Sequence, residues 1–217
     1  MPMQTRVVDA GAEGWLGEAL AILQAGGVVA FPTDTVYGVG ADPLQGAAVA
    51  ALYRAKGRPP DKAIPLLLAE VAQMEAMVTE VPAAARRLAG CFWPGPLTLV
   101  LPAREEVPAI VRAGGETVAL RMPAHPVALQ LIAAFGRPLA VTSANRSGQP
   151  SPAAAREVLR QLEGRIPLIV DGGGCPGGQP STVLSLAEHP PRLLRAGPVT
   201  WDAIAACLGL GVRAAGA

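Results

Sequence analysis

Two short loops carry the residues whose types and spacing are best suited to chemistry. The first holds Lys56 and Arg58 on either side of a glycine, with Lys62 four residues further on. Lysine offers a point charge and arginine a planar fork of donors, so this loop suits the phosphates of a nucleotide. The second holds Ser143 and Asn145, whose hydroxyl and amide groups suit phosphate, ribose or a metal-bound water. Taken singly, each loop is also explained by a solvated helix end or an ordinary turn.

The rarity of lysine and asparagine points to the same two loops. Among 18 basic residues only Lys56 and Lys62 are lysines, and Asn145 is the only asparagine of the 217 residues. The formal net charge of +1 argues against a protein that binds nucleic acid through a broad basic surface. A local positive pocket on a balanced surface remains compatible with that charge.

Cysteine and histidine do not form a metal-binding or nucleophilic pattern. Cys91, Cys175 and Cys207 are far apart, and no C-x-x-C occurs. With His125 and His189 as the only histidines, no zinc-ligand spacing emerges. We therefore expect three reduced, buried thiols, and we expect His125 to mark the start of a helix.

The elements that must position the polar loops follow from apolar spacing. Helices are predicted over 15–23, 44–55, 83–88, 127–135, 153–162 and 201–208. Strands are predicted over 28–31, 64–69, 97–101, 118–122, 139–142, 168–170, 182–186 and 192–194. This alternation predicts an α/β fold, a twisted mixed sheet flanked by helices, in which ligands bind between loops at strand ends.

The same pattern predicts a single domain over 1–217, with its motifs within 12–208 and a frayed tail over 209–217. No apolar run reaches the roughly 18 residues of a membrane span, and the N-terminus does not resemble a signal peptide. We expect a soluble, cytoplasmic protein that does not bind membranes.

The sequence contains no complete dinucleotide-binding, Walker A or nucleophile-elbow motif. Gly172, Gly174 and Gly177 match G-x-G-x-x-G, but a strand is predicted after them where a dinucleotide site needs a helix. Neither a Walker A loop nor a nucleophile elbow occurs. Covalent catalysis is poorly supported, and a nucleotide enzyme with another phosphate cradle remains open.

Seven ordered segments over residues 27–199 carry a family resemblance. They are FPTDTVYGVGADP, LYRAKGRPPDKAIPLLL, WPGPLTLVLP, VALRMPAHP, VTSANRSGQPSP, PSTVLSL and LLRAGPV. Together they closely resemble the YrdC/Sua5 family of threonylcarbamoyl-AMP synthases, including its K-x-R and S-x-N signatures. The resemblance implies that ATP, L-threonine and bicarbonate or CO2 are converted, with Mg2+, into threonylcarbamoyl-AMP and pyrophosphate. A partner transferase would then modify adenosine 37 of ANN-decoding tRNAs to t6A.

The resemblance also implies roles for individual residues. Catalysis would fall to Lys56, Arg58, Ser143 and Asn145. ATP would be bound by Lys56, Arg58, Lys62, Thr117, Ser143, Asn145, Ser151 and Arg195. L-threonine would be bound by Thr35, Arg121, Val141 and Ser181, with Arg121 on its carboxylate and Val141 acting through its backbone. Mg2+ would be held mainly by the ATP phosphates, with Asn145 nearby. Asp34 suits either an approach to Mg2+ or a turn cap.

Two departures from the family pattern stand out. Leu67 occupies about the place where many longer members carry a histidine near the threonine. The chain also ends soon after residue 208, as in a short form lacking the extra C-terminal domain. A lid would then come from the N-terminal segment, internal loops or a partner.

Two other functions remain open. One is an RNA-binding protein of the YciO type, which would bind tRNA weakly and directly. The other is a relative of the carbamoyltransferases of hydrogenase maturation, although the additional regions of those proteins do not occur in this sequence.

Overall fold

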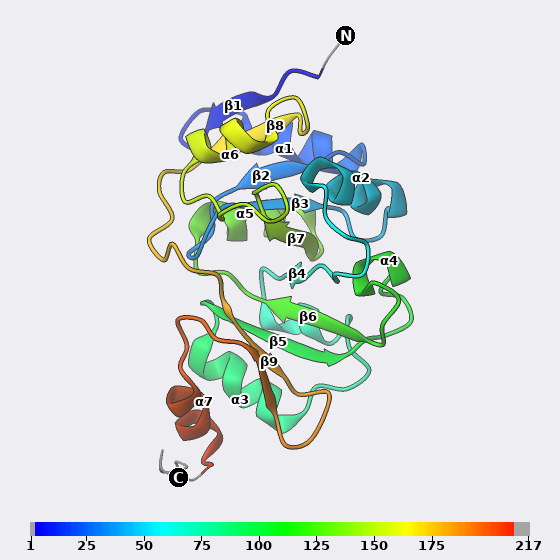
Figure 1. Ribbon diagram of the computed structural model, residues 1–217, viewed down its shortest axis with the longest axis vertical. Coiled ribbons are helices and arrows are strands. Elements are labelled where there is room, and N and C mark those ends of the chain that lie inside the picture. Colours follow the sequence, from blue (N-terminus) through cyan, green and yellow to red (C-terminus); the bar gives the residue numbers. More distant parts are fainter. Residues whose placement is uncertain (1–2, 211–217) are drawn as a thin grey trace.

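Short buried strands pair into one mixed sheet in the computed structural model, which describes residues 3–210. The strands are β1 (Arg6–Asp9), β2 (Val29–Phe31), β3 (Gly38–Ala41), β4 (Leu66–Leu67), β5 (Leu97–Pro102), β6 (Thr117–Arg121), β7 (Leu139–Ser143), β8 (Leu168–Asp171), β9 (Thr182–Ser185) and β10 (Arg192–Arg195). Their order is β1-β8-β2-β3-β7-β4-β6-β5-β9-β10, so the sheet runs along the long axis of the molecule (Figure 1). The predicted α/β fold with a mixed sheet is confirmed. Most of the tail expected to fray, residues 211–217, lies outside the described residues.

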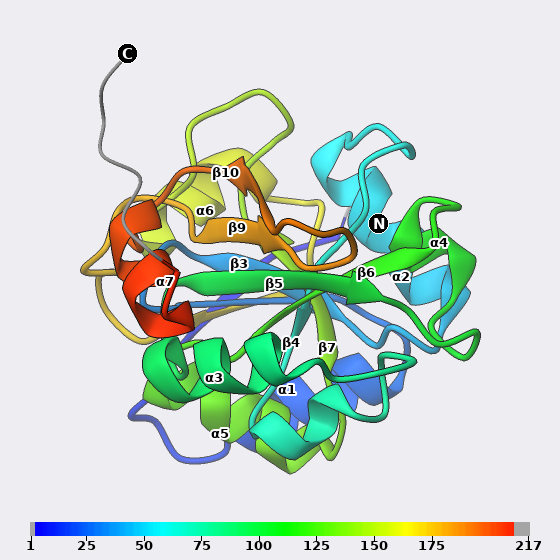
Figure 2. The same cartoon turned by 90° about the horizontal axis from the view of Figure 1, so that it is seen from below.

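Helices cover both faces of this sheet. They are α1 (Trp15–Gln24), α2 (Gly46–Lys56), α3 (Ala83–Phe92), α4 (Ala109–Arg112), α5 (Pro126–Phe135), α6 (Ala155–Leu162) and α7 (Trp201–Leu208), with a short 3-10 helix over Val71–Met74. α1 and α5 pack together over one core, and residues of α2, α3, α6 and α7 contribute to the other. Figure 2 shows α1, α3 and α5 on one side of the strands and α6 on the other. Within residues 3–210, no helix is long and apolar enough to cross a membrane.

The predicted helices and strands are present, with most ends displaced by one or two residues. The predicted strand over 64–69 pairs only at β4, and β1, β3 and α4 were missed. β3 escaped prediction because glycine is depleted in strands. Its glycines are required by close packing, since a Cβ on Gly38 would lie 2.6 Å from Cγ1 of Val141 on β7.

Two local expectations hold. His125 caps α5, where its Nδ1 accepts a hydrogen bond from the Val127 amide at 3.3 Å. The glycine run that begins at Gly172 leads into strand β9 rather than a helix, which excludes the dinucleotide motif.

The expectation of three reduced, buried thiols is wrong. Cys91 on α3 and Cys207 on α7 form a disulfide across 116 residues of sequence, and Cys91 is exposed. Only Cys175 is a free, buried thiol. The sequence could not reveal the pair, because the packing of α3 against α7 brings the two Cα atoms within 6.6 Å.

Candidate functional site

A polar cavity of about 350 Å³ opens where the loop between β2 and β3 meets the ends of β4, β6, β7 and β9. This volume lies within the range of small-molecule sites. The cavity brings together eight of the residues predicted to bind ligands: Thr35, Arg58, Arg121, Val141, Ser143, Ser151, Ser181 and Arg195. It therefore joins segments that are more than a hundred residues apart in the sequence.

Arg58 enters the cavity from the turn that ends α2. Gly57 adopts a left-handed conformation with φ of 61°, which favours glycine and turns the chain away from the helix axis. The Arg58 side chain then folds back, donating from Nε to the Lys62 carbonyl at 3.0 Å and from Nη2 to the Ala63 carbonyl at 2.7 Å. Nη1 makes neither of these bonds, so it can meet an anion in the cavity.

Lys56 lies beneath the cavity rather than in its wall. Its side chain is 2% exposed, and Nζ donates to the Ser143 carbonyl, to the Asn145 carbonyl at 2.6 Å and to Asn145 Oδ1 at 3.2 Å. These bonds occupy all three N–H groups of an ammonium. Burial, with the charge of Arg58, lowers the pKa of Lys56 to about 7. Lys56 therefore fastens the loop after β7 to the end of α2.

The S-x-N loop is closed by its own hydrogen bonds. Ser143 Oγ donates to Asn145 Oδ1 at 2.5 Å, while Asn145 Nδ2 donates to the carbonyls of Arg146 and Gln149 at 2.8 and 2.7 Å. The Asn145 amide is thus committed within the loop. Ser143 faces the cavity and keeps its acceptor capacity there.

Besides Lys56 and Asn145, two further predicted ATP-binding residues lie outside the cavity wall. Lys62 is exposed on the loop held by Arg58. Thr117 begins β6 and lies on the same face as Ala119 and Arg121, because side chains alternate along a strand. A ligand longer than the cavity could reach Thr117 along that row.

Arg121 is a second arginine of the cavity wall and is more deeply buried than Arg58. It is 6% exposed and donates from Nε to the Gly95 carbonyl at 2.9 Å, from Nη1 to Thr35 Oγ1 at 2.9 Å and from Nη2 to Asp34 Oδ1 at 2.5 Å. Asp34 also accepts from the Ala124 amide at 3.0 Å. Three of the five guanidinium N–H groups are used, which leaves two for a ligand carboxylate.

Ser181 and Arg195 close a third side of the cavity. Arg195 donates from Nε to the Ser181 carbonyl at 2.9 Å and from Nη2 to Ser181 Oγ at 3.1 Å. Thr98, which sequence reasoning missed, lies 2.8 Å from the same Oγ and is also in the wall. A polar residue inside the otherwise apolar run of β5 was the available signal for Thr98.

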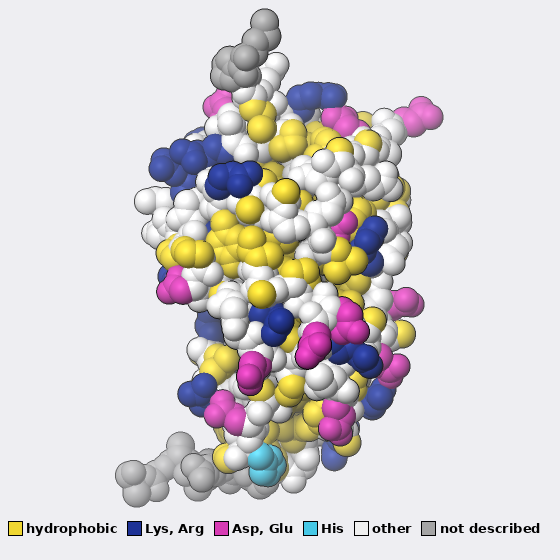
Figure 3. Space-filling view, turned by 90° about the vertical axis from the view of Figure 1, so that its right-hand side faces the viewer, with side chains coloured by type: hydrophobic (Ala, Val, Ile, Leu, Met, Phe, Trp, Pro, Cys, Tyr) yellow, Lys and Arg dark blue, Asp and Glu magenta, His cyan; other side chains and the backbone are white. Residues whose placement is uncertain are grey.

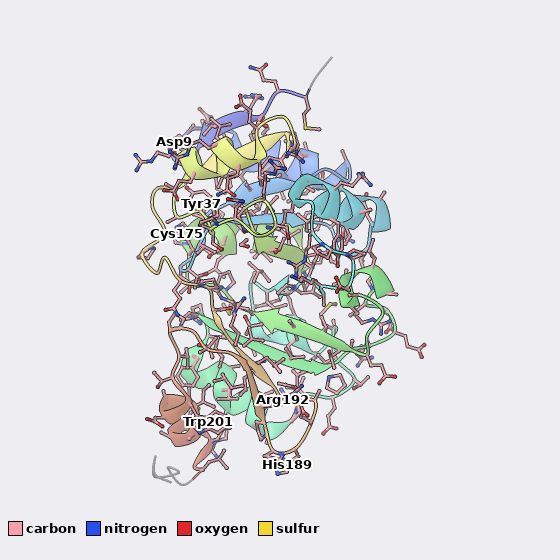
Figure 4. All side chains as sticks on the ribbon, viewed as in Figure 1. Asp9, Tyr37, Cys175, His189, Arg192 and Trp201 are labelled. Atoms are coloured by element: carbon pink, nitrogen blue, oxygen red, sulfur yellow. A yellow bond between two sulfur atoms is a disulfide. The ribbon has the colours of Figure 1, made fainter. Side chains whose placement is uncertain are left out.

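A layer behind the cavity joins the glycine-rich loop between β8 and β9 to the loop between β2 and β3, which carries Thr33 and Thr35. The Tyr37 hydroxyl is 3.1 Å from Asp171 Oδ1 and donates to the Gly173 carbonyl at 2.7 Å, while the Gly177 amide donates to the Asp34 carbonyl at 3.1 Å. Figure 4 shows Tyr37 near Cys175 in this layer. Tyr37 is fully buried, so it supports the wall without lining it.

The cavity wall suits anions better than a protein-bound metal. It contains Arg58, Arg121 and Arg195, and its nearest carboxylate, Asp34, is paired with Arg121. Residues 3–210 contain no group of three His, Cys, Asp or Glu side chains placed to hold a metal ion. Leu67, paired with Arg121 across β4 and β6, adds an apolar wall where a histidine was noted as the family alternative.

The fold and the cavity define an α/β protein that can bind an elongated anionic ligand or two anionic ligands side by side. The comparison with protein families identifies the family to which the chain belongs. The chain belongs to the Sua5/YciO/YrdC family, because residues 21–197 match its family model, which is described as "Telomere recombination". The resemblance found from the ordered motifs is confirmed.

Individual relatives agree with this membership. The chain is 47% identical over 191 residues to threonylcarbamoyl-AMP synthase of Pyrococcus abyssi, covering 88% of this chain and 56% of the relative. A putative threonylcarbamoyl-AMP synthase of Mycobacterium tuberculosis is 41% identical over 192 residues, covering 88% of each chain. The chain thus spans a little over half the length of the P. abyssi relative.

Solved structures give the same result. P. abyssi Sua5 complexed with L-threonine superposes with a TM-score of 0.89 and 46% identity, covering 94% of this chain and 60% of the other. YciO of E. coli superposes with a TM-score of 0.81 and 26% identity, covering 90% and 96%.

Proposed function

We propose that this protein synthesises threonylcarbamoyl-AMP from L-threonine, bicarbonate or CO2, and ATP, with release of pyrophosphate. The observation that carries the proposal is one cavity lined by two arginines, Arg58 and Arg121, each of which keeps N–H groups available for an anion. The names of the P. abyssi and M. tuberculosis relatives and the L-threonine complex of P. abyssi Sua5 support it.

The reaction needs positioning more than it needs an activated side chain. The amine of threonine attacks CO2, or bicarbonate with loss of water, to form a carbamate. A carbamate oxygen then attacks the α-phosphorus of ATP, and the bond to pyrophosphate breaks. Because the substrates supply both nucleophiles, the protein must hold them in line and balance the charge that develops on the phosphates.

We assign the phosphates to the Arg58 end, with Ser143, Ser151 and Arg195, and the threonine carboxylate to Arg121. Thr35, Ser181 and the Val141 segment enclose the amino acid. Lys56 and Asn145 act by shaping the loop after β7, since their polar atoms are engaged there. Lys62 and Thr117 are assigned to the outer part of a nucleotide that extends beyond the cavity.

Mg2+ enters this proposal with its substrate, as MgATP, because the cavity wall is cationic. The product passes to a partner transferase that forms t6A in tRNA, and this places the protein in the cytoplasm. Direct, weak binding of tRNA would occur outside the cavity.

Pyrophosphate release from MgATP tests the proposal directly. Release should require both L-threonine and bicarbonate, so omission of either should abolish it, and the adenylate should be identified by mass. Release that is indifferent to both omissions would overturn the proposal.

The alternatives predict other outcomes in the same assay. Turnover with carbamoyl phosphate but not with threonine would favour a carbamoyltransferase. Salt-dependent RNA affinity without threonine-dependent release would favour an RNA-binding protein. On the face shown in Figure 3, acidic and basic side chains lie interspersed over the lower half, so that part offers no continuous basic surface.

A further inference from the structure

Thr33 is a buried threonine that lines the cavity beside Thr35, and no role was predicted for it. Its side chain is 3% exposed. Its Oγ1 donates to the Val36 carbonyl at 2.7 Å. A carbonyl can only accept, and a hydroxyl has one proton. The Thr33 proton is therefore committed to Val36.

This commitment fixes the proton of the neighbouring Thr35. The two hydroxyl oxygens lie 3.0 Å apart. Since Thr33 has no second proton, Thr35 must donate in this contact. The amides of Thr35 and Val36 approach the same Thr33 oxygen at 3.2 and 3.3 Å, longer than the 3.0 Å hydroxyl contact, so three donors share its two lone pairs.

Arg121 fixes the other side of Thr35. Its Nη1 donates to Thr35 Oγ1 at 2.9 Å, and an arginine in a protein keeps its protons. The Gly95 carbonyl and Asp34 Oδ1 hold the planar guanidinium on its other nitrogens. The Thr35 oxygen thus gives one proton to Thr33, receives one from Arg121 and retains one lone pair toward the cavity.

We propose that Thr33 is a positioning residue that makes Thr35 a hydrogen-bond acceptor for the bound amino acid. The cavity then recognises an N–H or O–H donor close to the carboxylate held by Arg121. In the amino acid assigned to this end, the donor is the side-chain hydroxyl or the α-nitrogen. This inference rests on the proposed function, because it specifies how the cavity recognises the amino-acid substrate proposed above.

Three proteins test the proposal: the wild type, Thr33→Val, which keeps the shape but removes the hydroxyl, and Thr33→Ser, which restores it. The equilibrium binding of L-threonine, the KM for L-threonine and the KM for ATP are measured for each, together with the melting temperature. Thr33→Val should weaken L-threonine about three- to tenfold, the range of one hydrogen bond, and leave the KM for ATP unchanged. Thr33→Ser should return the wild-type value.

L-valine, which has the shape of threonine without its hydroxyl, distinguishes the two donors. If the hydroxyl is the donor, valine binds weakly to the wild type, and Thr33→Val reduces the preference for threonine. If the α-nitrogen is the donor, Thr33→Val weakens both amino acids by the same factor.

An unchanged threonine affinity in a folded Thr33→Val protein would overturn the inference. So would a loss that Thr33→Ser does not restore, or an equal loss for ATP, because each indicates general damage to the fold. These outcomes differ from failure of the proposed function, in which the wild type itself shows no threonine-dependent pyrophosphate release.

Discussion

Two arginines of the cavity wall, Arg58 and Arg121, are held in opposite ways. Arg58 is only partly buried, and its side-chain partners are two backbone carbonyls. Arg121 is almost fully buried and is paired with Asp34, whose side chain is 12% exposed. Among residues 3–210 Arg58 has no ion-pair partner, while Arg121 and Asp34 together form a nearly neutral pair.

This difference matches the charges of the two substrates that we propose. Phosphates carry several negative charges, and an uncompensated arginine attracts them strongly. A threonine carboxylate carries one charge, so precise geometry serves it better than excess charge. The contrast therefore separates an end built for electrostatic attraction from an end built for recognition.

The largest expected effect is on stability at the amino-acid end. Arg121→Ala leaves the Asp34 carboxylate buried without its partner, which typically costs about 3–5 kcal/mol. Arg58→Ala removes bonds to carbonyls that water can replace, and should cost less than about 1 kcal/mol. Urea unfolding measures both. The double variant Arg121→Ala/Asp34→Ala should recover part of the loss, and equal losses for the two single arginine variants would remove the contrast.

The next effect is on catalysis at the phosphate end. Arg58→Ala should remove about 2 kcal/mol of transition-state stabilisation, which lowers kcat/KM for ATP roughly thirtyfold. Arg54→Ala, an exposed arginine one turn earlier on α2, serves as the matched control. Steady-state pyrophosphate release provides the measurement, and similar rates for both variants would contradict the assignment of phosphate to Arg58.

A smaller effect concerns the pH dependence of stability. The pKa of Lys56 is lowered from 10.5 to about 7 in the folded protein, mainly by burial. Above pH 7 the unfolded chain holds a proton that the folded protein has lost, so this group makes stability rise with pH, by at most about 1.4 kcal/mol per pH unit. Below pH 7 the full penalty of burying the charge applies.

Lys56→Met removes this titration and keeps an unbranched side chain that is one atom shorter. The difference in unfolding free energy between wild type and Lys56→Met, measured from pH 6 to 8.5, should therefore shift in favour of the wild type as pH rises. A difference that is constant with pH would show that Lys56 stays charged throughout, held by its three acceptors.

The smallest effect lies in the layer behind Arg121. Tyr37→Phe removes the bonds to Asp171 and Gly173 and should destabilise the protein by about 1 kcal/mol. Because this layer supports the Asp34 loop, the KM for L-threonine should rise more than the KM for ATP. A rise in the KM for ATP alone would contradict this prediction, because it would show that Tyr37 supports the phosphate-binding part of the cavity instead.

Sequence reasoning succeeded where a signal was local. Strand and helix periodicity survives in short windows, so the alternating fold was predictable. Arg58 and Ser143 stood out as polar residues in loops beside apolar segments, and Arg121 was selected from the family resemblance; all three line the cavity. It failed where two distant groups define the role. Thr98 and Thr33 acquire meaning only from Ser181 and Thr35, and the Cys91–Cys207 pair depends on helix packing.

By itself the sequence determined the class of fold and the family resemblance, because these follow from periodicity and ordered motifs. Only the tertiary structure decided which charged side chains are engaged by other groups of the protein. Lys56 meets the loop at Ser143, and Arg121 meets Asp34, each across 87 residues of sequence. These long-range contacts set the burial and the hydrogen-bond partners of each side chain. Burial and partners in turn determine which polar atoms remain available for a substrate.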